Sequence, residues 1–462
     1  MARKALILAA VLVAACHREA PPLPSGAVLR VSQRNEPADL DPATASLPDE
    51  FFIIRALGEG LVLPAMPGQA APTPGAAAAW EVSPDGLTWT FHLRPDLAWS
   101  NGDPLTAQDF VDSFHRVLAP ATPAPRAELF APAASFSAPD ARTVVVRLKR
   151  PNARFLDYVA SGPWIPVNPR VVARFGREWT RPGHYVGNGP FVLNQWMPNR
   201  RIIVRRNPRY HGAAAPHIDE IDFIRYDDGD TEDRAFRAHE VDVTMAVPTE
   251  RIPIYRREDP AILHSAPLLE TRYLAFNTRR PPLDNPDVRR ALSAAIDRVR
   301  LVREVLRANQ RAAFSLLPAE GPSGRTDPMV GPAAAQRLLA QAGYPGGKGF
   351  PRLELSGWTG NAGNLVLEAV QQMWLEELGI ATTLVNRDAR VHIAALQSGN
   401  YDIALVALIP WVEDRRALLD SFTSDDPNNY PHWRDPAYDR LVADRDLKAA
   451  EQRLNEACIG AP

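Results

Sequence analysis

Residues 80–111 read WEVSPDGLTWTFHLRPDLAWSNGDPLTAQDFV and indicate the structure of their part of the chain. Apolar and polar residues alternate over residues 88–94, the period-2 pattern of a half-buried strand. Asp85-Gly86 supplies a turn before this strand, and residues 101–104 supply another after the next short stretch. Thr106 is placed to cap a helix, with a carboxylate three residues later. The stretch predicts a strand, a turn, a second strand and a capped helix, in that order.

The same residue order resembles one family closely, the periplasmic oligopeptide-binding proteins, which are the substrate-binding subunits of peptide ABC importers. The family pattern W…DG…TFHLR…W-S-[DN]-G-x-P-x-T-A-x-D-F is matched here between Trp80 and Phe110. Further matches follow in the family order, with NGPF at residues 188–191, RNP at 206–208 and VRRALSAAIDR at 288–298. The resemblance runs from about Val28 to the end of the chain. The alternative for residues 80–111 alone is an unrelated small αβ module.

This resemblance implies an α/β protein with the two-lobed periplasmic-binding-protein (Venus flytrap) fold, an extra subdomain, and mixed sheets flanked by helices. The 462 residues also exceed what one hydrophobic core usually serves. We expect a discontinuous first lobe at residues 28–62 and 183–268, the extra subdomain at 63–182, and the second lobe at 269–462. We expect one helix over 438–457, no strand after it, and no C-terminal return to the first lobe, which leaves a truncated, non-binding relative as an alternative.

The N-terminus has the features of a bacterial export signal. A charged start is followed by an apolar run over residues 5–15, too short to span a bilayer as a mature helix. The run ends Val13-Ala14-Ala15-Cys16, which resembles a lipoprotein lipobox with Cys16 as the acylated residue. We expect a signal peptide at 1–16, a tether at 17–27, and a periplasmic or cell-surface protein anchored to a bacterial membrane by lipid alone. The alternative is an ordinary signal peptide with a chance cysteine.

Composition and motifs exclude several functions. The formal net charge of −2 gives no basic field for nucleic acid. After processing only Cys458 remains as a thiol, so neither a disulfide framework nor a cysteine metal site is expected. Residues 343–349 are one residue short of a phosphate-binding loop and predict a surface turn. The acidic run at 227–233 lacks the ligand order of a calcium loop and predicts a solvated loop. No catalytic motif is present, so we expect neither an enzyme nor a cofactor or metal.

For ligand binding, the resemblance implies strand addition, in which an extended peptide pairs its backbone with exposed strand edges of two closing lobes. We expect a monomer that binds an oligopeptide and delivers it to the permease subunits of an ABC transporter. Carried over by position, the ligand-contacting segments are Ser46 and Leu47, Met245 and Ala246, and the strand Ala407, Leu408 and Ile409. The alternative for Leu408 and Ile409 is that they belong to an ordinary core strand that contacts no ligand.

The family's ammonium anchor is an Asp just after that strand, in a D-Y-x-x-P stretch. Here Trp411 stands at that place, and Glu413 or Asp414 could supply the carboxylate after a small loop shift. The alternative is that both acids are exposed loop residues. The Arg that captures a short ligand's carboxylate in some members has no match either, because Leu396 and Leu405 occupy the nearby positions. A peptide with a blocked N-terminus, or a solute such as a nickel chelate, heme or a glycan, is therefore an alternative ligand.

Overall fold

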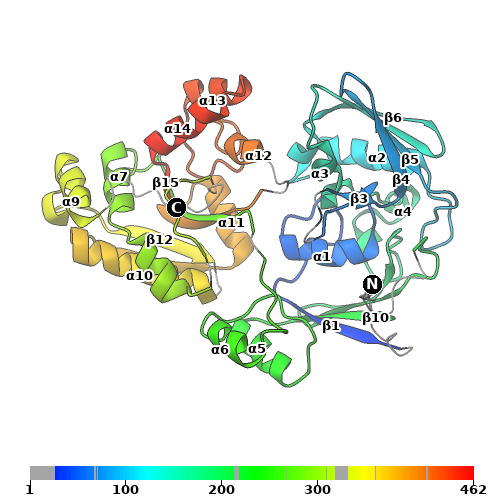
Figure 1. Ribbon diagram of the computed structural model, residues 1–462, viewed down its shortest axis with the longest axis horizontal. Helices are drawn as coiled ribbons and strands as arrows, with labels where there is room; N and C mark the ends of the chain where they lie inside the picture. Colours follow the sequence, from blue (N-terminus) through cyan, green and yellow to red (C-terminus); the bar gives the residue numbers. More distant parts are fainter. Residues whose placement is uncertain are drawn as a thin grey trace, which may run out of the picture.

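The computed structural model describes residues 26–66, 69, 71–212, 218–266, 268–308, 310–317, 331–358, 361–410, 412 and 415–462. Two lobes lie side by side, each built on a mixed sheet flanked by helices, and a further antiparallel sheet extends the first of them (Figure 1). The expected α/β, two-lobed fold class is confirmed. The residue boundaries of the lobes stay a prediction.

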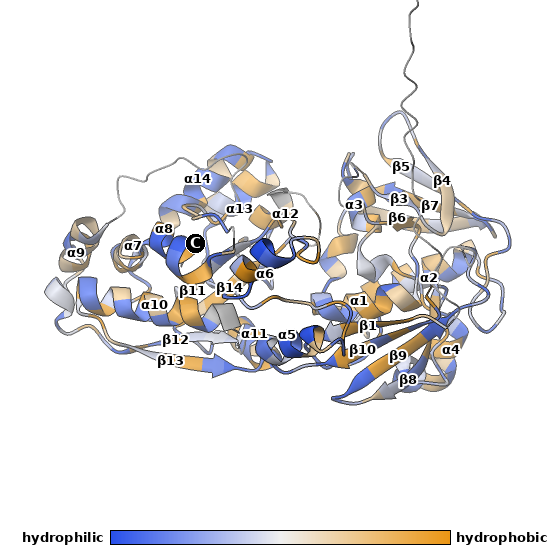
Figure 2. Ribbon diagram, turned by 60° about the horizontal axis from the view of Figure 1, so that its bottom comes forward, coloured by the Kyte–Doolittle hydropathy of each residue, from blue (hydrophilic) through white to orange (hydrophobic). Residues whose placement is uncertain are grey.

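The first lobe is organised around a four-stranded sheet. Strand β1 runs parallel to β10, and the other neighbours are antiparallel. Apolar residues concentrate along the strands of both lobes, whereas α5 is mostly hydrophilic (Figure 2). The sheet order is β1-β10-β9-β8, with β1 at Val28–Gln33, β8 at Phe191–Met197, β9 at Arg201–Arg206 and β10 at Glu220–Arg225; its helices are α1 (Pro48–Leu57), α5 (Gly229–Arg237) and α6 (Ile252–Glu258).

The extra subdomain contains the stretch that predicted strands and a capped helix, and both expectations are confirmed. The Asp109 carboxylate accepts hydrogen bonds from the Thr106 backbone N–H and hydroxyl at 2.8 and 3.1 Å. Phe130 stacks on Trp164 with ring centroids 4.3 Å apart, inside a core rich in aromatic side chains. The sheet order is β4-β5-β7-β6, with β4 at Ala77–Val82, β5 at Thr88–Leu93, β6 at Ala133–Asp140 and β7 at Thr143–Leu148. The remaining elements are β2 (Val62–Leu63), β3 (Thr73–Pro74), α2 (Ala107–Leu118), η1 (Ala127–Phe130), α3 (Phe155–Val159), η2 (Gly162–Trp164), α4 (Pro169–Phe175) and η3 (Gly176–Thr180).

The second lobe is built on a five-stranded sheet with β14 at its centre. Fully buried Trp374 packs into its core and donates its indole N–H to the Leu292 carbonyl at 2.9 Å. The sheet order is β13-β12-β14-β11-β15, with β11 at Thr271–Phe276, β12 at Leu353–Trp358, β13 at Thr382–Arg387, β14 at Ile403–Leu408 and β15 at Gly460–Ala461. Its helices are α7 (Pro286–Ala294), α8 (Arg298–Arg300), η4 (Leu301–Leu306), α9 (Pro332–Gln341), η5 (Pro345–Gly347), α10 (Asn361–Leu378), α11 (Ala389–Ser398), α12 (Arg415–Asp420), α13 (Pro436–Ala443) and α14 (Leu447–Ala457).

Two expectations about the C-terminal region are wrong. The single helix over residues 438–457 is two helices, because Arg445 takes a left-handed backbone with φ of 62° between α13 and α14. The expected absence of a following strand is also wrong, since β15 pairs with β11. Gly460 permits this close approach: a Cβ there would lie 2.4 Å from the Tyr273 ring.

The acidic run over residues 227–233 is not the solvated loop that its composition predicted. Asp228 caps α5 by accepting a hydrogen bond from the Thr231 backbone N–H at 2.8 Å, and the helix begins at Gly229. Glu232, in the first turn of α5, and Asp233, which follows it, face inward and are 0% and 5% exposed. Acidic residues favour a helix N-terminus because of its positive dipole end, which accounts for the run. Residues 343–349 do form a turn between α9 and β12, as expected.

Across the described ranges, no cluster of three or more His, Cys, Asp or Glu side chains is arranged to hold a metal ion. Within those same ranges, no helix has both the length and the apolar character needed to cross a membrane.

Candidate ligand-binding site between the lobes

Strand β14 uses its two edges differently. Along one edge all six residues from Ile403 to Leu408 pair with β11. Along the other edge, β12 pairs with Ile403 and Ala404 only. Among the described residues, no strand therefore covers the β12-facing edge of the second half of β14, and Ala407 in this half is only half-buried.

The hydrogen bonds of β14 show which residues face that open edge. The Ile403 carbonyl accepts from the Ser356 hydroxyl at 3.2 Å, and the Leu405 carbonyl accepts from His392 Nε2 at 2.8 Å. Because successive residues of a strand direct their backbone groups to opposite edges, Ala407 directs its N–H and C=O to the same open edge as these two. The open edge thus begins beyond the Leu405 carbonyl.

His392 closes the inner end of this opening. Its Nε2 must carry the hydrogen, since the Leu405 carbonyl can only accept. The side chain is 3% exposed, and burial lowers the pKa of His392 below its ordinary value. A neutral imidazole therefore substitutes for the strand partner that β14 lacks at Leu405.

The other two residues of the expected ligand-pairing strand lie in different surroundings. Leu408 pairs with Thr271 of β11 and is 9% exposed, whereas Ile409 follows the strand and is 37% exposed. Arg272, the β11 residue opposite Ala407, extends to within 6.0 Å of the Trp358 ring centroid on the far side of β14. A cation and an aromatic ring thus accompany the small Ala407 side chain at the open edge.

The expected first-lobe segment at Ser46 and Leu47 is shaped by one buried carboxylate. Glu50, 2% exposed, accepts from the backbone N–H groups of Ser46 and Leu47 at 2.8 and 2.9 Å. It also accepts from the Ala38 N–H at 3.2 Å. Hydrogen bonds from N–H groups to a carboxylate are among the strong ones in proteins, so Glu50 fixes the loop that enters α1.

The second first-lobe segment, Met245 and Ala246, is held in the same manner. The backbone N–H groups of Met245 and Ala246 both donate to Glu232 Oε1, and the Ala246 nitrogen lies 3.1 Å from this oxygen. The Ser32 hydroxyl donates to the same oxygen. The other carboxylate oxygen makes no hydrogen bond with the described chain, but Arg34 Nε lies 3.7 Å from it. In both first-lobe segments, the N–H groups therefore point to a buried acid. In the Met245–Ala246 segment this leaves the carbonyls as the groups that can meet a ligand's N–H donors, whereas the Ser46 and Leu47 carbonyls accept from Arg126 and from the Glu50 N–H.

One arginine of the second lobe reaches the Ser46–Leu47 loop. Arg390, in the first turn of α11, donates to Glu50 Oε1 at 2.9 Å and to the Glu36 carbonyl at 2.8 Å. Its side chain is 44% exposed, whereas Glu50 is buried. This clasp joins the lobes next to an expected ligand-contacting segment.

Arg126 and Glu128 of the subdomain lie near enough to Asp426, in the loop after α12 of the second lobe, for their charges to influence one another. Arg126 pairs with Glu128 at 3.7 Å and donates to the Ser46 carbonyl at 3.4 Å. Burial raises the pKa of Glu128, and the negative charge of Asp426 raises it further. Burial likewise raises the pKa of Asp426, while Arg126 opposes this rise. Two carboxyl groups from different lobes therefore share a partly dehydrated interface.

Four residues of the expected site lie outside the described residues: Trp411 at the anchor position, the candidate anchors Glu413 and Asp414, and the lipidation residue Cys16. Sequence reasoning missed the four residues that organise the rest of the site, Glu50, Glu232, Arg390 and His392. Glu50 carried a usable signal, because an acid at the third helical position commonly reaches back to the N-terminal backbone.

Comparison with known proteins supplies the family. The family model of bacterial extracellular solute-binding proteins, family 5 (middle), matches residues 71–430. The chain belongs to family 5 of the bacterial extracellular solute-binding proteins. Of its relatives in Escherichia coli K12, the probable deoxycholate-binding periplasmic protein YgiS is 32% identical, with 95% of this chain and 85% of the relative covered. The periplasmic murein peptide-binding protein MppA is 31% identical, with 95% and 89% covered.

Solved structures of the family also indicate the arrangement of the lobes. The Escherichia coli murein tripeptide-binding protein MppA superposes with a TM-score of 0.88 at 30% identity, covering 96% of this chain and 93% of its own. The unliganded open form of MppA gives only 0.66, also at 30% identity, covering 95% and 92%. Haemophilus influenzae OppA in complex with RPPGFSPFR gives 0.88 at 27% identity, covering 95% and 93%. Since the two MppA comparisons have the same identity, the difference lies in conformation, and this chain is arranged like the peptide complex rather than the open form.

Proposed function

We propose that this protein is the substrate-binding lipoprotein of an ABC importer and captures oligopeptides by strand addition between its closing lobes. The observation that carries the proposal is the open edge of β14 at Ala407, in a chain whose lobes are arranged as in a peptide complex. The peptide-binding names of family members support the ligand class. No cofactor or catalytic step is part of this proposal.

Strand addition suits the groups that the site offers. Ala407 can exchange both of its backbone hydrogen bonds with an extended ligand, while the Met245–Ala246 segment offers carbonyls to the ligand's N–H groups. Every oligopeptide carries these backbone groups, so affinity arises without reading side chains. Water held around the side chains would accommodate different sequences.

Transport follows from the proposed anchor and from closure. Diacylation or triacylation at Cys16 would hold the protein stably at a bacterial membrane face, in the periplasm or at the cell surface. The closed, loaded monomer would then deliver its peptide to the permease subunits. Labelling with a radioactive fatty acid tests the anchor: label is expected on the wild-type protein and absent from the Cys16→Ser variant, and equal labelling contradicts it.

Native mass spectrometry of the purified protein, before and after mild denaturation, tests the ligand class. Co-purified peptides are the expected result. A peptide that binds can then be resynthesised with single N-methylated amides, which remove one donor at a time. Strand addition predicts that alternate N-methyl positions weaken binding strongly, because alternate residues of a strand point to the same edge. Equal, weak effects at all positions would contradict the proposed mode.

A second candidate is a non-peptide organic acid. Trp411 stands where the family has its ammonium-binding Asp, and the relative YgiS is named as probably deoxycholate-binding. A ligand without an ammonium group needs no such Asp. Extraction of bound small molecules from the purified protein separates the two candidates: a bile-acid-like compound without peptides favours the second, and peptides favour the first.

A further inference from the structure

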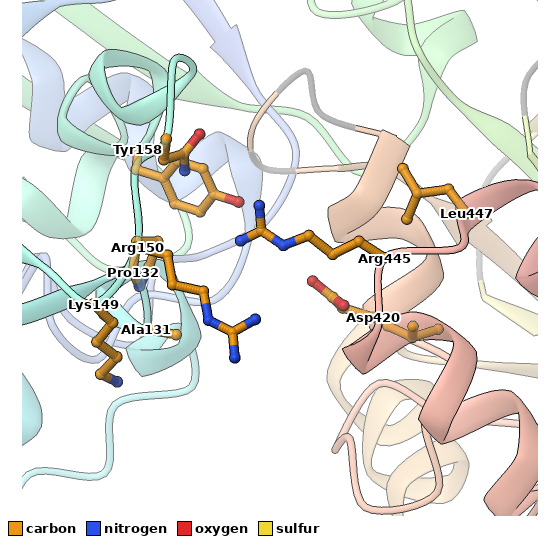
Figure 3. A pocket seen from close by; sticks show the side chains of 10 residues that line it. Ala131, Pro132, Lys149, Arg150, Tyr158, Asp420, Arg445 and Leu447 are labelled. Carbon is orange, nitrogen blue, oxygen red and sulfur yellow. The ribbon is translucent and has the colours of Figure 1, made fainter. Parts of the chain in front are cut away.

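A groove of about 370 Å³ separates the extra subdomain from the C-terminal helices. Lys149 and Arg150, which directly follow β7, line its subdomain side. Arg445, in the turn between α13 and α14, lines the opposite side together with Asp420. Figure 3 shows the Arg445 guanidinium extending across the groove toward Tyr158, with the Arg150 guanidinium on the subdomain side of the opening. The groove is thus built from both lobes.

The cations that line this groove outnumber its acids among the described residues. Neither Lys149, Arg150 nor Arg445 forms a salt bridge or side-chain hydrogen bond with the part of the chain that the structure describes. Neighbouring Arg154, by contrast, pairs with Asp157 at 2.7 Å. The lining carries three positive side chains and one negative side chain, Asp420, which leaves a net charge of +2. Closing the lobes concentrates this excess charge, which is unfavourable unless an anion enters.

We propose that this groove binds a multivalent oxyanion of the phosphate type between the lobes. Two guanidinium groups and an ammonium group, presented from both walls, are the donors that bind phosphate oxygens most strongly. The anion would neutralise the excess charge and replace repulsion by bridging hydrogen bonds. The same chemistry serves free phosphate and the phosphate headgroup of a lipid.

This inference rests on the proposed closing of the lobes. Because the two walls belong to different lobes, the complete site exists only in the closed conformation. An anion that binds only this state shifts the population toward it, and by linkage a ligand that closes the lobes raises the affinity for the anion by the same factor. Phosphate would therefore act as a co-ligand of the importer's receptor.

Calorimetric titration of sodium phosphate into the purified full chain, at constant ionic strength with chloride as the balancing anion, tests the site. Saturable binding is expected for the wild-type protein. The Arg445→Gln variant and the double variant Lys149→Gln/Arg150→Gln are each expected to bind about tenfold more weakly, since each removes charge-assisted hydrogen bonds. The matched control is Lys448→Gln, an exposed cation of α14 that does not line the groove, and it should bind like wild type.

Absence of saturable binding in the wild-type protein, or equal weakening by Lys448→Gln, would overturn the proposal. Small-angle scattering gives a second readout: phosphate should reduce the radius of gyration of the wild-type protein but not of Arg445→Gln, and an equal response would also overturn it. Co-sedimentation with phosphatidylglycerol vesicles, against phosphatidylcholine vesicles, identifies the source. Vesicle binding that depends on Arg445 indicates a headgroup, and its absence indicates the free anion.

Peptide titrations of the same samples separate this inference from the proposed function. Peptide binding without phosphate binding would refute the anion site alone. Phosphate binding with compaction, in a protein that binds no peptide, would refute the peptide-receptor function and leave the anion site standing.

Discussion

Replacing Arg390 by glutamine removes the contact by which α11 holds the first lobe. The wild-type side chain donates to Glu50 at 2.9 Å and to the Glu36 carbonyl at 2.8 Å. A hydrogen bond to a charged group is worth about 1.5–3 kcal/mol, but solvent screens a side chain that is 44% exposed. Because Glu50 itself is buried, we expect a loss of about 1–2 kcal/mol of closing energy, or roughly 5- to 30-fold in ligand affinity.

Arg390 is the better partner to change, because Glu50 also holds the backbone N–H groups of its own loop. Calorimetry with a peptide that the wild-type protein binds measures the affinity, and small-angle scattering measures the compaction. The matched control is Arg280→Gln, since Arg280 pairs with Asp402 at 2.8 Å within the second lobe and has a 42% exposed side chain. Unchanged affinity in the Arg390 variant, or an equal loss in the control, would refute the idea that the Arg390–Glu50 contact stabilises the closed form.

Four further outcomes follow from the described contacts. Ala407→Pro removes the N–H donor at the open edge of β14 but no hydrogen bond between β14 and β11. Peptide affinity measured by calorimetry should fall about tenfold or more, at nearly constant Tm. Retained affinity would argue against strand addition. Glu232→Ala removes the acceptor of the Ala246 N–H and of the Ser32 hydroxyl, while the Met245 N–H keeps the Ser32 oxygen. Stability should fall by about 1–3 kcal/mol in a denaturant titration, and an unchanged midpoint would contradict this. His239→Gly relieves a left-handed backbone with φ of 58° and should raise stability by up to about 1 kcal/mol in the same assay, whereas a decrease would contradict this. Because burial raises the pKa of Glu128 and Asp426, the closed form holds more protons than the open form. Ligand affinity should therefore rise as the pH falls toward the ordinary pKa values of 4.5 and 3.8, and this gain should be lost as the pH rises through the raised pKa values. A Glu128→Gln/Asp426→Asn variant should flatten this pH profile, and the opposite slope in the wild-type protein would contradict the reasoning.

Local sequence signals predicted much of the secondary structure. The Thr106 cap, the turn at Asp85-Gly86 and the alternation in β5 all depend on residues a few positions apart, where chain geometry alone decides the outcome. Asn285 likewise caps α7, as its position before Pro286 indicates. Such features follow from propensity and capping without knowledge of the tertiary fold.

The limit of local pattern is visible at residues 288–302, whose apolar spacing favoured one continuous helix. The helix instead ends at Ala294, and Asp297 caps a new turn by accepting from the Arg300 backbone N–H at 2.9 Å. Val299, which helical spacing from Val288 and Leu292 would place on the apolar face, is 54% exposed. The N-cap at Asp297 therefore starts a new helical turn within a stretch whose apolar spacing alone would predict one helix.

The site depends on partners that lie far apart in sequence. Glu232 receives hydrogen bonds from residues 13 and 200 positions away, and Arg390 and Glu50 are 340 residues apart. Nothing in the acidic run over residues 227–233 indicated which carboxylate would be buried. The family resemblance placed the ligand segments, but the side chains that hold those segments emerge only from the fold.

Small-angle scattering of ligand-free protein, before and after addition of a saturating peptide mixture, tests whether the lobes close around a peptide. Peptide is expected to lower the radius of gyration to the value calculated from the closed arrangement. A folded protein whose radius of gyration does not change, in the presence of peptides at millimolar concentration, would contradict capture of peptides by lobe closure.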